Sequence, residues 1–397
     1  MAGLNETPRG NRIHIAFFGL RNAGKSTLVN AFTGQQIAIV SDVPGTTTDP
    51  VLKAMEILPL GPCLITDTAG LDDEGELGVM RVEKTLDVLA TTDIAVWVWG
   101  EGNQNANLRE SGESARMFFE VCQKRGVAVL EHRRGDSVEG LKGKIAAVKL
   151  EERAPGLLDG LVEKGDRVLC VVPIDESAPK GRLILPQQQV IRECLDKHVT
   201  VMACQPDELL DCLGFGSFDL KGRLLVVTDS QAFRQVNQTI RQSNNQTIRL
   251  TSFSVLFARQ KGDLSEFVKG LKAIGSLKDG DAVLVAEGCT HHRQCNDIGT
   301  VKIPKALEKL SGKKLKFEFA SGGGFLDSCA SLTSGKDSAS PLSCPSLIVH
   351  CGGCMLTRRE MLRRIATAKE AGVPIVNYGL VLAMANGIDV ESLMFKV

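Results

Sequence analysis

Residues 12–34 read "RIHIAFFGLRNAGKSTLVNAFTG": an apolar run, a turn that contains glycine, and a segment with apolar residues at helical spacing. This order predicts a strand, a loop and a helix. Gly19 to Ser26 forms the pattern G-x-x-x-x-G-K-S between strand and helix. Glycines let backbone amides wrap phosphate groups, Lys25 can reach the outer phosphates, and Ser26 can ligate Mg²⁺. The stretch therefore predicts a phosphate-binding loop, and a chance glycine-rich turn is the weaker reading.

Two further segments stand at suitable distances along the chain. Residues 41–50, "SDVPGTTTDP", supply Thr47 for a switch that senses the terminal phosphate through Mg²⁺, and residues 64–71, "LITDTAGL", end an apolar strand with Asp67 and Gly70. A single threonine could merely cap a turn, but the ordered series favours nucleotide hydrolysis. We expect catalytic roles for Lys25, Thr47, Asp67 and Gly70. We expect nucleotide contacts from Gly19, Asn22, Ala23, Gly24, Lys25, Ser26, Thr27 and Asp67.

These motifs resemble the translation-factor-like GTPases that include Era and the MnmE group. The resemblance implies GTP and Mg²⁺ as ligands. It also implies K⁺ at Asn22, although a turn-forming asparagine is an equal alternative. Leu71 stands where a water-orienting glutamine would be, so hydrolysis is expected to be slow or to depend on another group. Glu74 and Glu76 are candidates for that group, and solvated loop residues are the simpler reading.

The motif that recognises guanine is missing from the expected place. A GTPase of this type carries N-K-x-D after a strand, whereas residues 126–140, "GVAVLEHRRGDSVEG", offer Asp136 instead. Asp136 could pair with the guanine edge, or it could be an ordinary surface aspartate. We therefore expect reduced selectivity for GTP.

Length and composition bound the remaining possibilities. The chain has 397 residues, with 47 Lys plus Arg and 47 Asp plus Glu, so no global field attracts nucleic acid or an acidic membrane. Its apolar runs are far shorter than the roughly 20 residues of a spanning helix, and the first residues lack the apolar core of a signal peptide. We expect a protein of the cytoplasm or an organelle matrix with no nucleic-acid or membrane partner.

The pattern of elements predicts an α/β protein: a P-loop GTPase domain over residues 8–164, then two smaller α/β domains over residues 165–258 and 259–397. The middle domain carries no catalytic motif. Asp175 and Asp229 could be active-site carboxylates at strand ends, but capping or solvation is the simpler reading. Exposed apolar strands there suit contact between subunits.

The chain has twelve cysteines and no short secreted framework, which favours reduced thiols and metal binding over disulfides. Residues 282–289, "AVLVAEGC", and 346–351, "SLIVHC", are apolar strands that each end in a thiol, where an α/β sheet presents its ligand site. The predicted metal ligands are Cys289, His291, His350, Cys351 and Cys354. Such a set suits zinc or an iron-sulfur cluster, and a redox dithiol is the chemical rival. Ordinary buried thiols are expected at Cys63, Cys122, Cys170, Cys194, Cys204 and Cys212.

A phosphate loop followed by C-x-H and H-C-x-x-C resembles the HydF family of maturation GTPases for iron-only hydrogenases. The resemblance extends through "VVPIDESAPKGRLILPQ", "TDSQAF" and "LTSFSVLFARQKGDL". It implies a GTPase domain, a dimerisation domain and an iron-sulfur domain. It implies a 4Fe-4S cluster on Cys289, Cys351 and Cys354, with His291 and His350 associated.

The resemblance also implies a role as a homodimeric scaffold and carrier for a diiron precursor. The implied partners are two radical-SAM maturases and the immature iron-only hydrogenase. Three cysteines leave one iron of a 4Fe-4S cubane without a cysteine ligand, and an exchangeable ligand or an incoming unit could occupy it. The main alternative is a ribosome- or RNA-associated P-loop GTPase with a zinc-stabilised C-terminal domain.

Overall fold

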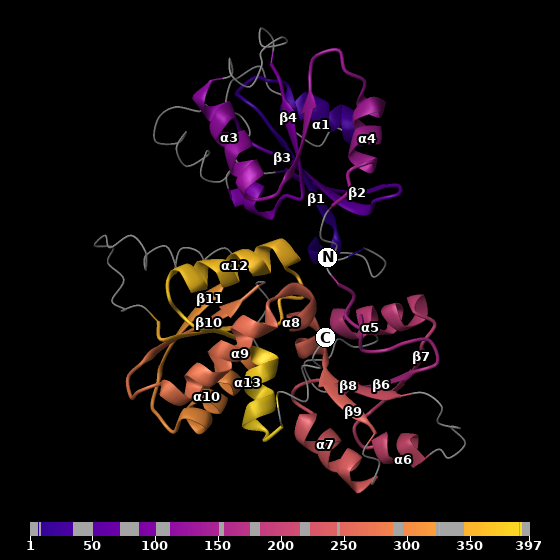
Figure 1. The fold of residues 1–397 in the computed structure, drawn as a ribbon, viewed down its shortest axis with the longest axis vertical. Coiled ribbons are helices and arrows are strands. Elements are labelled where there is room, and N and C mark those ends of the chain that lie inside the picture. Colours follow the sequence, from indigo (N-terminus) through magenta and orange to yellow (C-terminus); the bar gives the residue numbers. More distant parts are fainter. Residues whose placement is uncertain are drawn as a thin grey trace. The chain divides into compact units, whose positions relative to one another are not determined.

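The computed structural model describes residues 7, 9–34, 51–71, 87–100, 112–150, 155–174, 183–214, 223–243, 247–288, 297–322, 325, 345–388 and 390. Contacts divide the chain into two compact units, Met1–Arg153 and Ala154–Val397 (Figure 1). Among the helices in this part of the chain, none combines the length and the apolar character needed to cross a membrane.

The first unit contains a five-stranded sheet in the order β2-β3-β1-β4-β5. Only the β2–β3 pair is antiparallel among these neighbours. The elements are η1 (Arg9–Asn11), β1 (Ile13–Phe18), α1 (Lys25–Thr33), β2 (Val51–Ile57), β3 (Gly61–Asp67), β4 (Ile94–Val98), α3 (Glu113–Lys124), β5 (Ala128–His132) and α4 (Val138–Ala146).

Alternate residues of β1 pack on opposite faces of this sheet. Ile15 and Phe17 lie in the core under α1 and α4, whereas Ala16 and Phe18 lie in the core under α3. Figure 1 shows α3 on one side of the sheet and α1 and α4 on the other. Both faces are covered, which explains why the central strands read as continuous apolar runs rather than alternating ones.

The second unit contains two four-stranded parallel sheets. The sheet nearer in sequence has the order β7-β6-β8-β9. Val168 and Cys170 of β6 face the core that contains α5, whereas Leu169 and Val171 face the core that contains α6 and α7. The elements are β6 (Arg167–Val171), α5 (Leu185–Asp196), β7 (Thr200–Cys204), α6 (Leu209–Gly214), β8 (Leu224–Thr228), α7 (Phe233–Gln242), β9 (Arg249–Ser252) and α8 (Phe253–Lys261).

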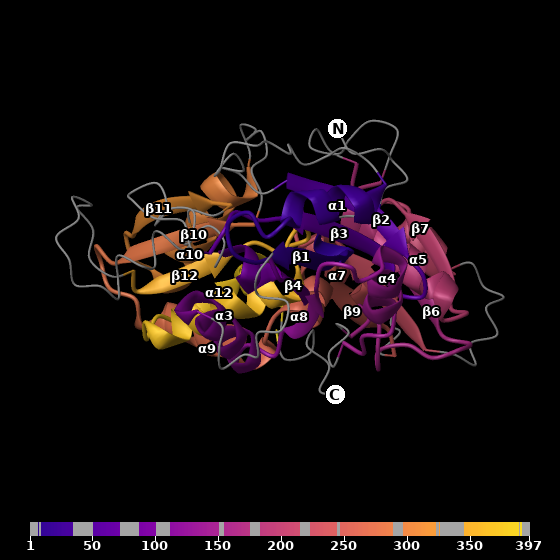
Figure 2. The same cartoon turned by 90° about the horizontal axis from the view of Figure 1, so that it is seen from above.

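The other sheet has the order β11-β10-β12-β13, and Figure 2 shows β11, β10 and β12 side by side in that order. In Figure 1, α12 covers one face and α9, α10 and α13 cover the other. The elements are α9 (Leu264–Ala273), η2 (Ile274–Ser276), β10 (Ala282–Glu287), η3 (Ile298–Lys302), α10 (Ile303–Ser311), β11 (Lys316–Ser321), β12 (Leu347–His350), α12 (Arg358–Glu370), β13 (Ile375–Asn377) and α13 (Tyr378–Ala385).

Helix α8 joins the two halves of the second unit. Val255 and Ala258 belong to the core of the β10–β13 sheet, whereas Phe253, Leu256 and Phe257 belong to the core above β6 and β8. The helix therefore runs across residue 258, the predicted end of the middle domain. The predicted α/β class is confirmed. A five-stranded sheet with both parallel and antiparallel pairs is followed by two smaller parallel sheets, and helices cover all three.

Candidate functional site

The phosphate loop joins β1 to α1, as the sequence predicts. Asn22 has φ 58° and Gly24 has φ 89°, so the loop contains two left-handed residues just before the helix begins. A Cβ atom at Gly19 would lie 2.5 Å from the backbone oxygen of Val98, so the close approach of β4 requires glycine there. Asn22 and Thr27 are exposed and Ala23 is half-buried.

Lys25 is held against this loop rather than extended into solvent. Its side chain is 7% exposed, and its Nζ atom donates to the backbone oxygen of Leu20 at 2.8 Å and that of Gly19 at 3.3 Å. The ammonium group therefore lies inside the loop whose amides would surround phosphate groups.

Ser26 and Asp67 meet at the carboxyl ends of β1 and β3. The Ser26 hydroxyl donates to Asp67 Oδ2 at 2.6 Å. Asp67 is fully buried, and its Oδ1 atom has no hydrogen-bond partner among the described residues. Burial raises the pKa of Asp67, while the Ser26 hydroxyl and the Lys25 charge oppose that shift. A hydroxyl beside a carboxylate with an unused buried oxygen fits the oxygen ligands that Mg²⁺ prefers.

The D-x-x-G segment closes over the loop. The Leu71 amide donates to the backbone oxygen of Gly19 at 3.3 Å, and the Thr68 hydroxyl donates to that of Phe17 at 2.7 Å. Gly70 is buried, and Leu71 is 3% exposed within the core under α3. The residue after D-x-x-G therefore points into the protein and offers no polar group to water. Thr47 lies outside the described residues.

The loop after β5 differs from a guanine-binding loop. Asp136 is exposed, and its Oδ2 atom accepts the Arg133 amide at 2.9 Å, which stabilises its own turn. The Arg133 guanidinium lies over the Trp99 ring at 5.2 Å and pairs with Glu131 at 3.2 Å. Trp99 Nε1 also donates to Glu131 at 2.8 Å. This loop is thus organised by an Arg-Trp-Glu cluster that sequence reasoning did not identify.

The C-terminal sheet brings the two predicted thiol-bearing strand ends together. β10 and β12 are parallel neighbours, with Ala286 opposite His350. The amides of Gly288 and Gly353 donate to Cys351 Sγ at 3.1 and 3.4 Å. Two backbone N–H groups on one sulfur favour its anionic form, which is the form that binds metals.

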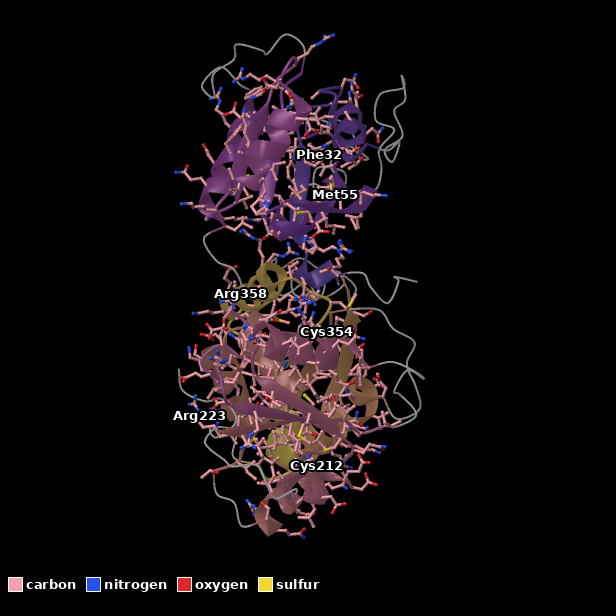
Figure 3. The ribbon with its side chains drawn as sticks, turned by 90° about the vertical axis from the view of Figure 1, so that its right-hand side faces the viewer. Phe32, Met55, Cys212, Arg223, Cys354 and Arg358 are labelled. Carbon is pink, nitrogen blue, oxygen red and sulfur yellow. The ribbon has the colours of Figure 1, made fainter. Side chains whose placement is uncertain are left out.

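The turn after β12 depends on two close approaches. Gly353 has φ 63°, and a Cβ atom there would lie 2.5 Å from Met361 Cε. A Cβ atom at Gly288 would lie 2.7 Å from Leu356 Cγ. Figure 3 labels Cys354 and Arg358, which lie at the end of this turn and the start of α12. The left-handed backbone at Gly353 favours glycine there, and the Leu356 side chain leaves little room for a side chain at Gly288.

Lys261, at the end of α8, donates hydrogen bonds to the backbone of this turn. Its Nζ atom donates to the backbone oxygens of Gly353, Cys354 and Leu356 at 3.3, 2.9 and 2.7 Å. Burial lowers the pKa of Lys261 to about 8. Burial likewise raises the pKa of Cys354, and the charge of Lys261 opposes that shift. The sequence pattern gave no signal for this lysine.

His350 is fully buried, and both of its ring nitrogens are engaged within the protein. Nδ1 lies 2.8 Å from the Cys351 oxygen, and Nε2 lies 3.0 Å from the Arg364 guanidinium. Because arginine only donates, Nε2 accepts and Nδ1 carries the proton. Burial and the nearby charge of Arg364 lower the pKa of His350 to about 4, so the ring is neutral. Arg364 also donates to Glu360 at 2.9 Å and to the Gly322 oxygen at 2.6 Å.

Cys289 and His291, the other predicted ligands, lie outside the described residues. Within the part of the chain that the structure describes, no three His, Cys, Asp or Glu side chains gather in a way that could hold a metal ion. Of the six cysteines predicted to be buried, those at positions 63, 122, 170, 194 and 204 lie in apolar cores, whereas Cys212 is only half-buried. Burial raises the pKa of Cys170 and Cys194 to about 12, as expected of inert packing thiols.

Asp229 follows β8 and accepts Gln187 Nε2 at 3.1 Å, while its backbone oxygen accepts the Ala232 amide at 2.9 Å. These contacts are those of a residue that organises the start of α7. Asp175 lies outside the described residues.

Comparison with family models divides the chain into three matched segments. Residues 14–127 match the model described as 50S ribosome-binding GTPase. Residues 157–262 match the hydrogen maturase F dimerization domain, and residues 265–394 match the hydrogen maturase F tetramerization domain.

Curated relatives match over only part of the chain. The chain is 36% identical to the tRNA modification GTPase MnmE of Endomicrobium trichonymphae over 94 residues, which cover 23% of this chain and 20% of that protein. It is 35% identical to the GTPase Der of Xylella fastidiosa over 149 residues, which cover 36% of this chain and 32% of that protein. The chain thus spans about a fifth to a third of the length of these relatives.

Among solved structures, Era of Aquifex aeolicus bound to GDP and AlF4⁻ matches with 15% identity and a TM-score of 0.25, over 79% of this chain and 94% of that one. The fold assignment rests on strand order and family models instead. A GTPase domain is followed by both hydrogen maturase F domains. The chain therefore belongs to the hydrogen maturase F, or HydF, family.

Proposed function

We propose that this protein is a GTP-hydrolysing, 4Fe-4S-containing scaffold that receives a diiron precursor and delivers it to an immature iron-only hydrogenase. The observation that carries the proposal is the turn after β12, where Cys351 Sγ accepts two backbone N–H groups beside the end of β10. Peptide N–H groups directed at a sulfur are a means by which proteins tune iron-sulfur centres. The same chain carries a complete phosphate loop, so nucleotide state and metal centre are linked in one molecule.

The residues proposed to hold the cluster are Cys351 and Cys354 in the turn and Cys289 after β10. Bound there, the cluster would supply an iron site without a cysteine ligand, to which a precursor could attach reversibly. Both ring nitrogens of His350 are already engaged. We therefore favour His291 as the exchangeable fourth ligand and His350 as a residue that positions the turn.

In the nucleotide site, we propose that Gly24 and its neighbours bind the phosphates, Lys25 neutralises their charge, and Ser26 with Asp67 holds Mg²⁺. Gly70 and Thr47 are proposed to sense the terminal phosphate. Leu71 is buried and apolar, which supports slow turnover with a regulatory role. K⁺ at Asn22 remains part of the proposal, and its test is whether turnover differs between potassium and sodium buffers.

The two HydF domain models support self-association, which we propose begins as a homodimer through residues 157–262. Assembly beyond the dimer is proposed for residues 265–394. The proposed external partners are two radical-SAM maturases and the immature hydrogenase, in the cytoplasm or an organelle matrix.

The test is anaerobic purification of the whole chain, followed by iron and sulfide analysis and electron paramagnetic resonance of the reduced protein. We expect four irons per chain as the ideal content of a 4Fe-4S cluster, and a large loss of iron in Cys351→Ser and Cys354→Ser. Cys122→Ser is the matched control, because Cys122 is a buried core thiol of the first unit. A colourless protein that contains zinc would contradict the proposal and favour a zinc-stabilised GTPase.

A further inference from the structure

The backbone of the turn after β12 contacts both a sulfur atom and an ammonium group. Within the turn, the Gly353 amide donates to Cys351 Sγ, and the Gly288 amide, which follows β10, donates to the same sulfur. The turn's carbonyl oxygens at residues 353, 354 and 356 all accept from one ammonium group, that of Lys261. One amide of the turn thus contacts the Cys351 sulfur, while three of its carbonyl oxygens contact the ammonium group of Lys261.

Lys261 is unusual for a lysine because only 2% of it is exposed. Three carbonyl acceptors require three N–H donors, so the geometry itself requires the charged –NH₃⁺ form. Its Nζ atom also lies 5.3 Å from the centre of the Phe257 ring. Among the residues that the structure describes, no carboxylate pairs with it. A buried charge balanced by backbone dipoles and an aromatic face is costly unless an anion lies nearby.

The candidates for that anion are the sulfurs of Cys354 and Cys351, whose charges act on Lys261 and which are thiolates when they bind a metal. Cys351 and Cys354 are half-buried, and both belong to the turn that Lys261 holds. Cys354 packs against the core that includes Leu256 and Phe257 of α8, while Cys351 packs against the core of the C-terminal sheet. One rigid helix therefore sets the place of both the ammonium group and the wall against which one sulfur rests.

We propose that Lys261 is the positioning residue of the metal-binding turn, fixing its backbone through three carbonyls and supplying the counter-charge for the thiolates of Cys351 and Cys354 and the anionic centre they hold. The proposal rests on the proposed function, because it assigns a role at the same cluster. It adds a residue from α8, which precedes the cysteine motifs by a long stretch of chain.

Two effects follow from removing the charge in Lys261→Met. The three carbonyls lose their donor, so the turn loses its fixed shape and metal uptake falls. The cluster that remains loses a nearby positive charge, which disfavours its reduced, more negative form. We expect the ratio of reduced to oxidised cluster at a given potential to fall at least tenfold, which corresponds to a midpoint shift of about −59 mV for a one-electron couple.

The experiment compares wild type, Lys261→Met, Lys261→Arg and Lys269→Met after anaerobic reconstitution, by iron content and by redox titration. Lys269 is the matched control, since it is a solvent-exposed lysine of α9 paired with Glu266. We expect Lys269→Met to match the wild type and Lys261→Arg to return the potential toward it. A merely structural role would lower iron content without moving the potential of the remaining cluster. A Lys261→Met protein with wild-type potential therefore overturns the proposal.

Circular dichroism and size-exclusion chromatography check folding first. If Lys261→Met does not fold, Lys261→Gln decides the same comparison, because glutamine keeps two N–H donors and carries no charge. If the wild type takes up no iron-sulfur cluster, the proposed function fails, and cobalt(II) titration of the metal-free protein decides the role of Lys261. The sulfur-to-cobalt charge-transfer absorption reports how tightly cobalt(II) binds. A tenfold weaker affinity for cobalt(II) in the variant supports the role. Equal titrations, or no binding by the wild type, overturn it.

Discussion

Replacing Arg364 with methionine should destabilise the second unit by about 4 kcal/mol. The side chain is 2% exposed and donates to three acceptors: Glu360, His350 Nε2 and the Gly322 oxygen. Breaking a buried ion pair costs about 3–5 kcal/mol. Glu360 keeps a second partner, Arg363, at 3.1 Å. The loss of the ion pair is therefore expected at the lower end of that range, about 3 kcal/mol. The buried His350 nitrogen left without a donor adds about 1 kcal/mol.

Urea unfolding can measure this effect with an internal control. Both tryptophans of the chain, Trp97 and Trp99, belong to the first unit, so tryptophan fluorescence follows that unit alone. Hydrogen-exchange mass spectrometry of peptides from residues 154–397 follows the second unit. With a denaturant dependence of about 2–3 kcal/mol per molar urea, a loss of about 4 kcal/mol lowers the midpoint by about 1.5 M.

The control variant is Arg192→Met, because Arg192 forms an exposed pair with Asp196 on α5. We expect no measurable change there, since exposed ion pairs contribute little. If Arg364→Met shifts the second unit no more than Arg192→Met does, the buried network does not stabilise this unit. If the tryptophan transition moves equally, the effect is not local to it.

Three further predictions concern the nucleotide site. Lys25→Ala should abolish GTP hydrolysis while iron content stays at the wild-type level, because the phosphate loop and the cysteine-bearing turn after β12 lie in different units; parallel loss of both in a folded protein would contradict this. Burial raises the pKa of Asp67, so its carboxylate should take up a proton at a higher pH than an exposed aspartate. Mg²⁺-dependent nucleotide binding should accordingly weaken on acidification, and calorimetric titrations of Asp67→Asn should lack this step. Finally, because Asp136 is engaged in its own turn, titration with GTP and ATP should reveal weak discrimination, and Asp136→Asn should change it little; strong preference for GTP that Asp136→Asn abolishes would sink this reasoning.

The nucleotide site could be predicted from the sequence because its chemistry is local. Gly19 to Ser26 is a short continuous motif, and its strand-loop-helix context is set by apolar spacing within the same segment. The contact between Ser26 and Asp67 spans 41 positions, but the motif order anticipated it. What remained hidden was the Arg133-Trp99 contact, because nothing in either segment indicates that the two strands carrying them are neighbours.

The cysteine-bearing turn after β12 could be predicted only in part. The apolar runs before Cys289 and Cys351 correctly indicated two strands, and their parallel pairing follows from the α/β pattern. Glu360 and Arg364, by contrast, stand at i and i+4 of a helix, a spacing typical of solvent-exposed ion pairs, yet both are buried. Burial of such a pair depends on the tertiary placement of α12 over the sheet, which helical spacing alone does not reveal.

Lys261 was hidden for a different reason, and its position changes how the family segments relate in this chain. A lysine in the last turn of a helix normally indicates a solvated residue that complements the helix dipole. Here it belongs to the segment matched by the dimerization model, which ends at residue 262, but its ammonium group holds a turn in the segment matched by the tetramerization model. Helix α8 also contributes residues to the cores on both sides. The turn proposed to bind the metal is therefore built from both segments. A substitution that shifts α8 in the first segment should alter the proposed metal site in the second without touching a cysteine.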